Sequence, residues 1–397
     1  NDEVVHGIPG DRVLEEGDII GLDVGVILDG YYGDTAATVP VGGVDEERRK
    51  LIRVTRESLE RGIAAIRPSA PKGARALDVR GAYVAPGFID LHVWGDPRVV
   101  AREAIRGGTT AFLSTLGPEP PARLLRDVEA RARQAGPGGA DGAACLGVHL
   151  EGPFLNPARG GALPKRWMRR PAAAEMSRLA RAAGKALRLI TFAPELGGAP
   201  EAIRWCAAHG VAASRGHSEA TAAEALEAVD AGASAATHVF NGMRPFHHRE
   251  PGLLDVALTD PRLTAMAILD GVHISAYAFR LLLRAKGPGG VALVTDSIRH
   301  EGWPVTRQRG AYYTARGVLA GSGLTMIRAV RNAVISGGAS VADAVRMASE
   351  TPARLLGLGR SLGALEVGRR ADLVVFDAQY RVRLTLVHGR VVHHLSR

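Results

Sequence analysis

The chain has 397 residues, more than one hydrophobic core usually covers, so its length predicts two or three domains, or one barrel with a satellite domain. A hydrophobic fraction of 46% and a charged fraction of 23% are typical of globular proteins and exclude disorder or a collagen-like repeat as a description of the whole chain. No apolar run approaches the ~18–20 residues that a membrane span needs.

The formal net charge of +9 raises the question of a nucleic-acid partner. Of the 50 basic residues only five are Lys, and the Arg residues are scattered among Ala, Gly and Glu instead of forming a stripe. Aromatic residues, which stack on exposed bases, make up only 5% of the chain. We therefore expect no nucleic-acid partner, no membrane partner, and at most an anionic small substrate.

The cysteine content and the first residues bear on the cellular compartment. Cys145 and Cys206 are too few for a disulfide framework and fit a reducing compartment. Asn1, Asp2 and Glu3 do not begin the basic-then-apolar pattern of a secretory signal. We expect a soluble cytoplasmic protein.

The N-terminal part of the chain predicts a hairpin followed by a helix. Residues 18–40 contain two apolar-rich runs around Asp29-Gly30, a dipeptide that suits a tight turn. Residues 45–66 carry apolar positions at helical spacing with charges between them. The Pro- and Gly-containing stretch 68–73 then predicts a linker.

From residue 83 onward, short apolar runs alternate with helical stretches. The expected strands cover 83–93, 110–115, 144–150, 187–192, 211–214, 234–239, 264–269 and 291–295. The expected helices cover 98–106, 121–134, 173–183, 199–209, 220–231, 275–285, 325–336, 341–348 and 352–357. Eight strands separated mostly by helices predict the α/β class and a (β/α)8 barrel, whose chemistry lies at the C-terminal ends of the strands.

The tail returns to strand-like alternation over 364–394 and predicts a small separate sheet. We therefore divide the chain into an N-terminal α+β segment (1–66), a small β-sandwich satellite (67–82 and 360–397) and the barrel (83–359).

Six acids and histidines stand at the ends of five predicted strands, where they would converge on one mouth of the barrel. They are Asp90, His92, Glu151, His217, His238 and Asp296. A carboxylate and imidazoles suit Zn²⁺ or a similar divalent ion, and three protein ligands leave a position open for water. We expect Glu151, His217 and His238 to bind one such ion, zinc, in a hydrolytic site with Asp296 as the acid/base.

Several motifs give this part of the chain, about 70–397, a family resemblance. They are APGFIDLH (85–92), HLEGPFLNP (149–157), GHSEAT (216–221), THVFNGM (237–243), HHREPGL (247–253), DGVH (270–273), LVTDS (293–297) and LAGSGLTM (319–326). In this combination the chain resembles the N-acetylglucosamine-6-phosphate deacetylases of the amidohydrolase superfamily.

The resemblance implies a metal-dependent hydrolase that removes acetyl from a phosphorylated amino sugar. It implies the metal ligands and the acid/base already named, and a homodimer in which Arg249 meets the sugar phosphate. The implied substrate contacts come from Asn241, Gly242, Arg249, His273, Leu319, Ala320 and Gly321. A guanidinium fork suits a phosphate dianion.

Two positions depart from the family pattern. Many superfamily members have His-x-His after the first strand, but this chain reads His92-Val93-Trp94, so we expect a single metal ion with His92 as an optional ligand. Leu163 stands where the family usually has a substrate-binding His. Hydrolysis of a different acylated amine, or a catalytically impaired fusion protein, therefore stays as an alternative.

Residues 1–66 resemble part of a methionine aminopeptidase instead. His6, Asp23 and Asp34 match that family's substrate-binding His and its first two metal carboxylates. The later ligands have no counterpart, so we expect a fusion without aminopeptidase activity. Because the usual N-terminal strands of the deacetylase family are largely missing, we also expect the hairpin at 19–39 to substitute for partner strands of the tail sheet.

Overall fold

The structure is a computed structural model that describes residues 13–28, 31–65, 78–79, 81–136, 142–299 and 304–395. The chain divides into two compact units, Asn1–Asp78 and Val79–Arg397. His6 and the Asp29-Gly30 turn lie outside the described residues.

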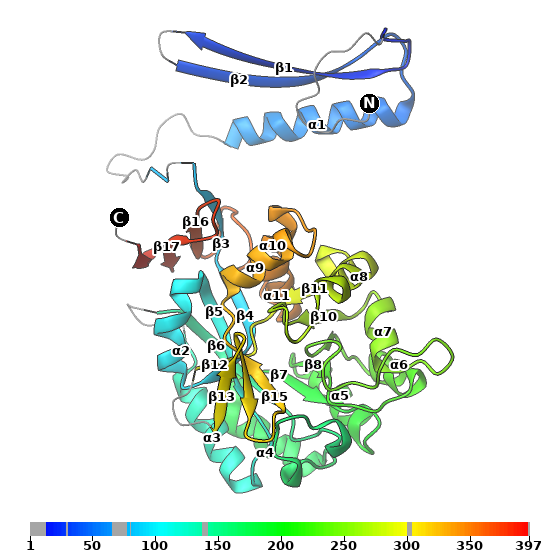
Figure 1. The fold of residues 1–397 in the computed structure, drawn as a ribbon, viewed down its shortest axis with the longest axis vertical. Helices are drawn as coiled ribbons and strands as arrows, with labels where there is room; N and C mark the ends of the chain where they lie inside the picture. Colours follow the sequence, from blue (N-terminus) through cyan, green and yellow to red (C-terminus); the bar gives the residue numbers. More distant parts are fainter. Residues whose placement is uncertain are drawn as a thin grey trace. The chain divides into compact units, whose positions relative to one another are not determined.

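The first unit is the predicted hairpin and helix. Strands β1 (Ile19–Leu28) and β2 (Tyr31–Pro40) pair antiparallel, with Leu28 opposite Tyr31. Helix α1 (Glu46–Ala65) follows, and Oδ1 of Asp45 accepts a hydrogen bond of 2.8 Å from the backbone N–H of Arg48 at its start. An acceptor there satisfies one of the amides that a helix N-terminus leaves unpaired. Both predicted elements are confirmed (Figure 1).

The second unit contains the predicted barrel, built on eight parallel neighbouring strands. They are β4 (Phe88–Gly95), β5 (Thr109–Leu116), β6 (Ala144–Glu151), β7 (Leu187–Phe192), β8 (Ala212–Arg215), β9 (Ala235–Ala236), β10 (Thr264–Ala267) and β11 (Val291–Leu293). The last and first strands are tied where β11 ends, because the backbone N–H of Asp296 donates to the carbonyl of His92 at 2.9 Å. The (β/α)8 prediction is confirmed.

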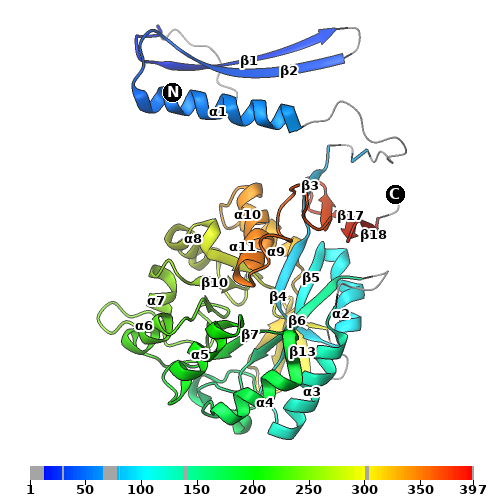
Figure 2. The same ribbon diagram turned by 180° about the vertical axis from the view of Figure 1, so that it is seen from behind.

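Helices cover the outside of the barrel (Figure 1 and Figure 2). They are α2 (Pro97–Ala104), α3 (Pro121–Gln134), α4 (Ala173–Ala183), α5 (Ala199–Ala208), α6 (Ala222–Asp230), α7 (Leu253–Thr259), α8 (Ala276–Lys286), α9 (Met326–Ile335), α10 (Val341–Ala348) and α11 (Glu350–Leu355). Short 3-10 turns lie at Ile105–Gly107, Pro157–Arg159, Lys165–Trp167, Gly184–Ala186 and Pro288–Gly290. Helix α7 was not predicted, because its seven residues are too few to show helical periodicity.

An insertion of four strands after β11 was also not predicted. It consists of β12 (Ser297–Arg299), β13 (Val305–Gln308), β14 (Ala311–Thr314) and β15 (Leu319–Ser322). Strand β12 pairs parallel with both β4 and β15, whereas β13, β14 and β15 pair antiparallel, so the insertion extends the barrel sheet sideways from the last residues of β4. Strands of three or four residues carry too few alternations to be found from sequence.

The tail forms a four-stranded sheet from β3 (Tyr83–Pro86), β16 (Leu373–Phe376), β17 (Val382–Val387) and β18 (Arg390–His394). The single strand expected over 83–93 is therefore wrong, because its first four residues pair with β16. The chain changes sheets at Gly87, where a β-carbon would lie 2.1 Å from Oγ1 of Thr110.

The strand that completes the tail sheet is thus β3, while β1 and β2 pair with each other in a sheet of their own. The expected substitution of the hairpin for partner strands of the tail sheet stays a prediction. The ring of Tyr83 stacks on Phe376 of β16 with centroids 5.2 Å apart, which packs β3 onto this sheet.

The three clusters of buried apolar side chains all begin at or after Ala85. The second unit therefore has a hydrophobic core built from its own residues. Among the described helices, none is both long and apolar enough to cross a bilayer.

Removal of residues 1–78 should leave the second unit folded, because the core lies within residues 85–392. We expect the thermal midpoint of the truncated protein to stay within about 3 °C of that of the full chain, measured by circular dichroism. Removal of residues 371–397 is the matched control and should lower the midpoint much further, because it deletes the buried Val374 and Phe376. Equal losses in the two truncations would contradict an independent second unit.

Candidate active site

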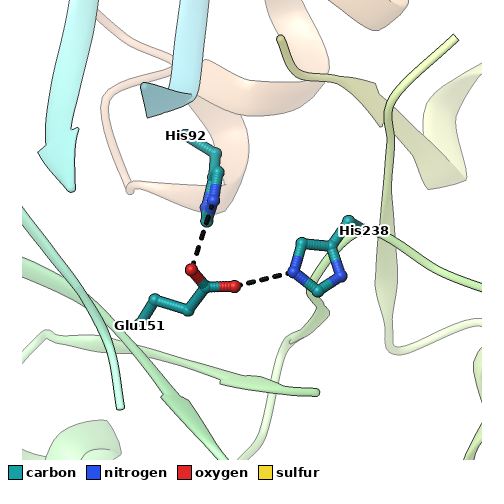
Figure 3. A group of neighbouring side chains, drawn as sticks. All are labelled: His92, Glu151 and His238. Carbon is teal, nitrogen blue, oxygen red and sulfur yellow. Dashed lines mark hydrogen bonds and ion pairs between the residues drawn. The ribbon is translucent and has the colours of Figure 1, made fainter. Parts of the chain in front are cut away.

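The carboxylate of Glu151 lies at the C-terminal end of β6 and is the centre of a buried group of imidazoles. Its Oε1 lies 2.9 Å from Nε2 of His217 and 2.7 Å from Nε2 of His238. Its Oε2 lies 3.6 Å from Nε2 of His92 (Figure 3). Four residues from the ends of β4, β6, β8 and β9 therefore meet at one point, as their positions in the sequence predict.

The backbone directs these side chains by an uncommon conformation. His217, His238 and Asp296 follow shortly after β8, β9 and β11 and have φ values of 50°, 28° and 49°. Non-glycine residues adopt such left-handed conformations at a cost of roughly 1–3 kcal/mol each, which the surrounding structure must offset. Three such residues at one mouth of the barrel mark it as the functional end.

A backbone carbonyl outside the cluster fixes the orientation of the His217 ring. Its Nδ1 lies 2.7 Å from the carbonyl oxygen of Arg159, which can only accept, so Nδ1 carries a proton. In the neutral ring the lone pair is then on Nε2, the nitrogen that faces Glu151, where it is available to a cation. Gly242 (φ 62°) closes over this ring, because a β-carbon there would lie 2.8 Å from Nδ1. A histidine held in this way is typical of a metal ligand.

His149 supports His92 in the same way and was not predicted as a site residue. Its Nδ1 lies 3.1 Å from Nδ1 of His92 and 3.1 Å from the carbonyl oxygen of Leu91. Its Nε2 lies 2.9 Å from Oγ1 of Thr191. Burial, together with the charge of His92, lowers the pKa of His149 well below its usual value, so this ring is neutral at pH 7.

The electrostatics of the cluster favour positive charge at its centre. Burial opposes ionisation of His92, but the carboxylates of Glu151 and Asp296 raise its pKa to about 9. The pKa of His217 is likewise raised, since the carboxylate of Glu151 outweighs the effect of burial. Burial alone would raise the pKa of Glu151, yet the surrounding imidazoles hold it well below its usual range. Without another cation, protons on the imidazoles balance the carboxylate.

The same residues fit a divalent metal ion. Donor atoms of His92, Glu151 and His238 lie within 4.8 Å of one another, and all three residues are buried. Within the described part of the chain, Nδ1 of His238 is buried without a hydrogen-bond partner, and Nε2 of His92 is buried with an ion-pair contact of 3.1 Å to Oδ1 of Asp296 but no well-directed hydrogen bond. Buried polar atoms of this kind call for a ligand. One carboxylate with imidazoles is a donor set that suits zinc and similar ions.

Asp296 stands beside this cluster. Its Oδ1 accepts a hydrogen bond of 2.8 Å from the indole Nε1 of Trp94 and lies 3.1 Å from Nε2 of His92. Its Oδ2 lies 3.8 Å from Nε2 of His273. The ring of His273 is oriented by Asp270, whose Oδ2 lies 2.7 Å from Nδ1. Neither Trp94 as a donor to Asp296 nor Asp270 as a partner of His273 was predicted.

The expected substrate-binding residues divide into two groups. Gly242, His273 and Gly321 lie against the cluster, since a β-carbon on Gly321 would come within 2.9 Å of the carbonyl oxygen of Asp296. Leu319 and Ala320 precede Gly321 on β15 and are half-buried. Nδ2 of Asn241 donates to the carbonyl of His238 at 3.3 Å. Arg249 is not part of the cluster: it is exposed, and its Nη1 lies 2.9 Å from Nε2 of His248.

Asp90 ties two barrel strands together instead of facing the reaction site. Its Oδ2 accepts from the hydroxyl of Thr295 at 2.5 Å, and its Oδ1 accepts from the backbone N–H of Thr295 and of His92. Burial raises the pKa of this carboxyl group, against the effect of these hydrogen bonds. Both carboxylate oxygens of Asp90 thus accept hydrogen bonds from residues of the barrel.

Comparison with known proteins gives two family matches. Residues 83–392 match the amidohydrolase family, and residues 1–88 match metallopeptidase family M24. The chain is 36% identical to an N-acetylglucosamine-6-phosphate deacetylase of Bos taurus, over 88% of this chain and 98% of the relative. It is 34% identical to an N-acetylgalactosamine-6-phosphate deacetylase of Escherichia coli O157:H7, over 83% of this chain and 92% of the relative.

A solved structure is also similar over most of the chain. It is a variant of N-acetyl-D-glucosamine-6-phosphate deacetylase from Mycobacterium smegmatis in complex with N-acetyl-D-glucosamine-6-phosphate. The TM-score is 0.75 at 35% identity, and the match covers 82% of this chain and 90% of the other.

Replacement of Glu151 should weaken metal binding strongly, because its carboxylate lies 2.9 Å from Nε2 of His217 and 2.7 Å from Nε2 of His238. We expect Glu151→Gln to weaken binding of Zn²⁺ at least about 100-fold. Loss of a residue that only hydrogen-bonds to a metal ligand already costs up to about 100-fold, and Glu151 is itself a proposed ligand. The measurement is metal content and competition with a chelator. Glu201→Gln, an exposed residue of α5 that pairs with Arg204, is the matched control. Equal Zn²⁺ affinity in both variants would contradict the assigned centre.

Proposed function

The chain belongs to the amidohydrolase family, and on that basis we propose that it hydrolyses the acetamide of N-acetylglucosamine 6-phosphate to glucosamine 6-phosphate and acetate. The observation that carries this proposal is the Asp296 carboxylate beside the Glu151 cluster. It lies 3.1 Å from Nε2 of His92, and its second oxygen lies near His273. This arrangement combines a cation site with a proton acceptor, the two parts that hydrolysis of an amide requires.

Glu151, His217 and His238 would hold one zinc ion, with His92 as a further donor at the same centre. When bound, such an ion polarises a carbonyl oxygen and makes water a stronger acid. The chain's own residues prepare the site. The carbonyl of Arg159 fixes the ring of His217, and the barrel strands hold Glu151 with the imidazoles buried around it.

Asp296 carries the proton in both halves of the reaction. Its carboxylate takes a proton from the water that adds to the amide carbon, and it then gives this proton to the amine nitrogen as the C–N bond breaks. Oδ2 suits this role, since in the described part of the chain it accepts no hydrogen bond, whereas Oδ1 is held by Trp94. The products are the free amine and acetate.

The sugar would be bound by residues around this centre. With Nδ1 of His273 donating to Asp270, Nε2 of the neutral ring can accept from a sugar hydroxyl. We assign further contacts to the backbone of Asn241 and Gly242 and to residues 319–321. Arg249 would bind the phosphate. Its exposure supports a position at the interface of a homodimer, where it could serve the neighbouring site.

A different acylated amine is a second candidate substrate. The favouring observation is Leu163, an apolar side chain that packs near Trp94 at the edge of the site. The similar deacetylase of the epimeric N-acetylgalactosamine 6-phosphate makes that sugar the first comparison to run. Both cysteines are free and buried, which supports a reducing, cytoplasmic location for the reaction.

Loss of the proposed acid/base should remove turnover without removing the metal. We expect Asp296→Asn to lower kcat for acetate release by about 100- to 10,000-fold, because the amide cannot accept the proton. Metal content should match that of the wild type. Asp230→Asn, which changes an exposed partner of Arg262 on the outside of the barrel, should leave kcat unchanged. An active Asp296→Asn enzyme would contradict the assignment of the base.

Loss of the proposed phosphate ligand should change substrate binding more than turnover. We expect Arg249→Ala to raise KM for the phosphorylated sugar by about 10- to 100-fold, since a charge-assisted hydrogen bond is lost. The rate with the unphosphorylated sugar should not change. Arg204→Ala, another exposed arginine, is the control. Equal use of both sugars by the wild type would remove the phosphate assignment.

A further inference from the structure

Trp94 lies next to the proposed acid/base and takes part in no step described so far. It stands two residues after His92 on β4, and side chains two apart on a strand point to the same face. Its ring meets that of His92 edge to face, with centroids 5.8 Å apart, and only 6% of the residue is exposed. The indole N–H donates to Oδ1 of Asp296 at 2.8 Å.

The edge of the indole ring that lies away from its N–H faces Gly117, and Leu163 lies close to the same glycine. A β-carbon on Gly117 would lie 3.1 Å from Cη2 of Trp94 and 3.4 Å from Cδ2 of Leu163. Trp94 and Leu163, the two departures from the family pattern, therefore lie on the same small region of the site. Contacts at both ends of the ring fix the direction in which its N–H points.

The main chains of Trp94 and Asp296 are held together as well. The backbone N–H of Asp296 donates to the carbonyl of His92, and Ile298 of β12 pairs with Trp94 of β4. These bonds fix where the Cα of Asp296 lies, but they leave rotation of its carboxylate about the side-chain torsions undecided. The indole N–H fixes that rotation, because it engages one carboxylate oxygen and not the other.

We propose that Trp94 is a positioning residue for the hydrolysis proposed above, on which this inference rests. Its N–H holds Oδ1 of Asp296, so that Oδ2 faces His273 and the reacting groups. An indole N–H donates only and cannot ligate a cation, so this side of Asp296 is held by a proton donor and not by a second ion. Holding a reactive group in one orientation is how a residue without chemistry of its own raises kcat.

The kinetic test compares two Trp→Phe substitutions. Trp94→Phe removes the N–H and keeps an aromatic ring, and we expect kcat to fall by about 10- to 100-fold with KM within about threefold of wild type. Metal content should be unchanged. Trp205→Phe is the control, since Trp205 of α5 stacks on His209 on the outside of the barrel. In the Asp296→Asn background, Trp94→Phe should cause no further loss, a result that a general structural role would not produce.

A spectroscopic test examines the contact without using substrate. With ¹⁵N-labelled indole groups, the resonance missing in Trp94→Phe identifies the N–H of Trp94. Replacement of Asp296 by Asn should move that resonance upfield, because a neutral amide accepts a weaker hydrogen bond than a carboxylate. This measurement keeps Trp94 in place, so it does not depend on how well Trp94→Phe folds.

The outcomes separate this inference from the proposed function. If the wild type releases acetate but Trp94→Phe retains the kcat of Trp205→Phe, Trp94 is not a positioning residue. An indole resonance that is the same in wild type and Asp296→Asn would also overturn the contact. If the wild type releases no acetate from either phosphorylated sugar, the proposed function fails, while the indole resonance still decides whether Trp94 holds Asp296.

Discussion

The structure of the second unit depends on the buried carboxylate of Glu151. A charge this deeply buried is stable only if opposite charge and donors surround it. Here they come from His92 of β4 and from His217 and His238, which follow β8 and β9. The strand ends must therefore meet within a few ångströms. Left-handed backbone at His217 and His238 turns both rings towards the carboxylate. The backbone strain at these residues is offset by an interaction that only the closed barrel can make.

The sequence predicts the barrel well because its strands are buried and its helices are amphipathic. Helices α3 and α4 begin and end at the residues expected from their apolar spacing. The insertion β12–β15 and the helix α7 were not foreseen, since elements of three to seven residues hold too few periods to be recognised. The change of sheet at Gly87 depends on its close approach to Thr110, a contact that no local pattern encodes.

The site was predictable to the extent that it lies at strand ends. Glu151, His217, His238 and Asp296 could be selected because the C-terminal ends of parallel strands share one face of a barrel. The groups that hold these side chains in place could not be identified from the sequence. The indole of Trp94 reaches Asp296 across 202 residues of sequence, and His217 is oriented by a backbone carbonyl, which any residue could supply. Such supporting contacts are set by side-chain direction and tertiary packing, which a sequence pattern does not contain.

The two units also differ in what they could do alone. A hairpin and one helix bury little apolar surface, and a two-stranded sheet is marginally stable by itself. Asp23 and Asp34 lie on paired strands, where Asp23 is opposite Ala36 and Asp34 is opposite Gly25, so the two are diagonal neighbours in the register and not a directly opposed pair. The second unit, in contrast, contains the core, the strand ends and every residue of the proposed site. The reaction is therefore assigned to residues 79–397, whereas the match to metallopeptidase family M24 covers residues 1–88.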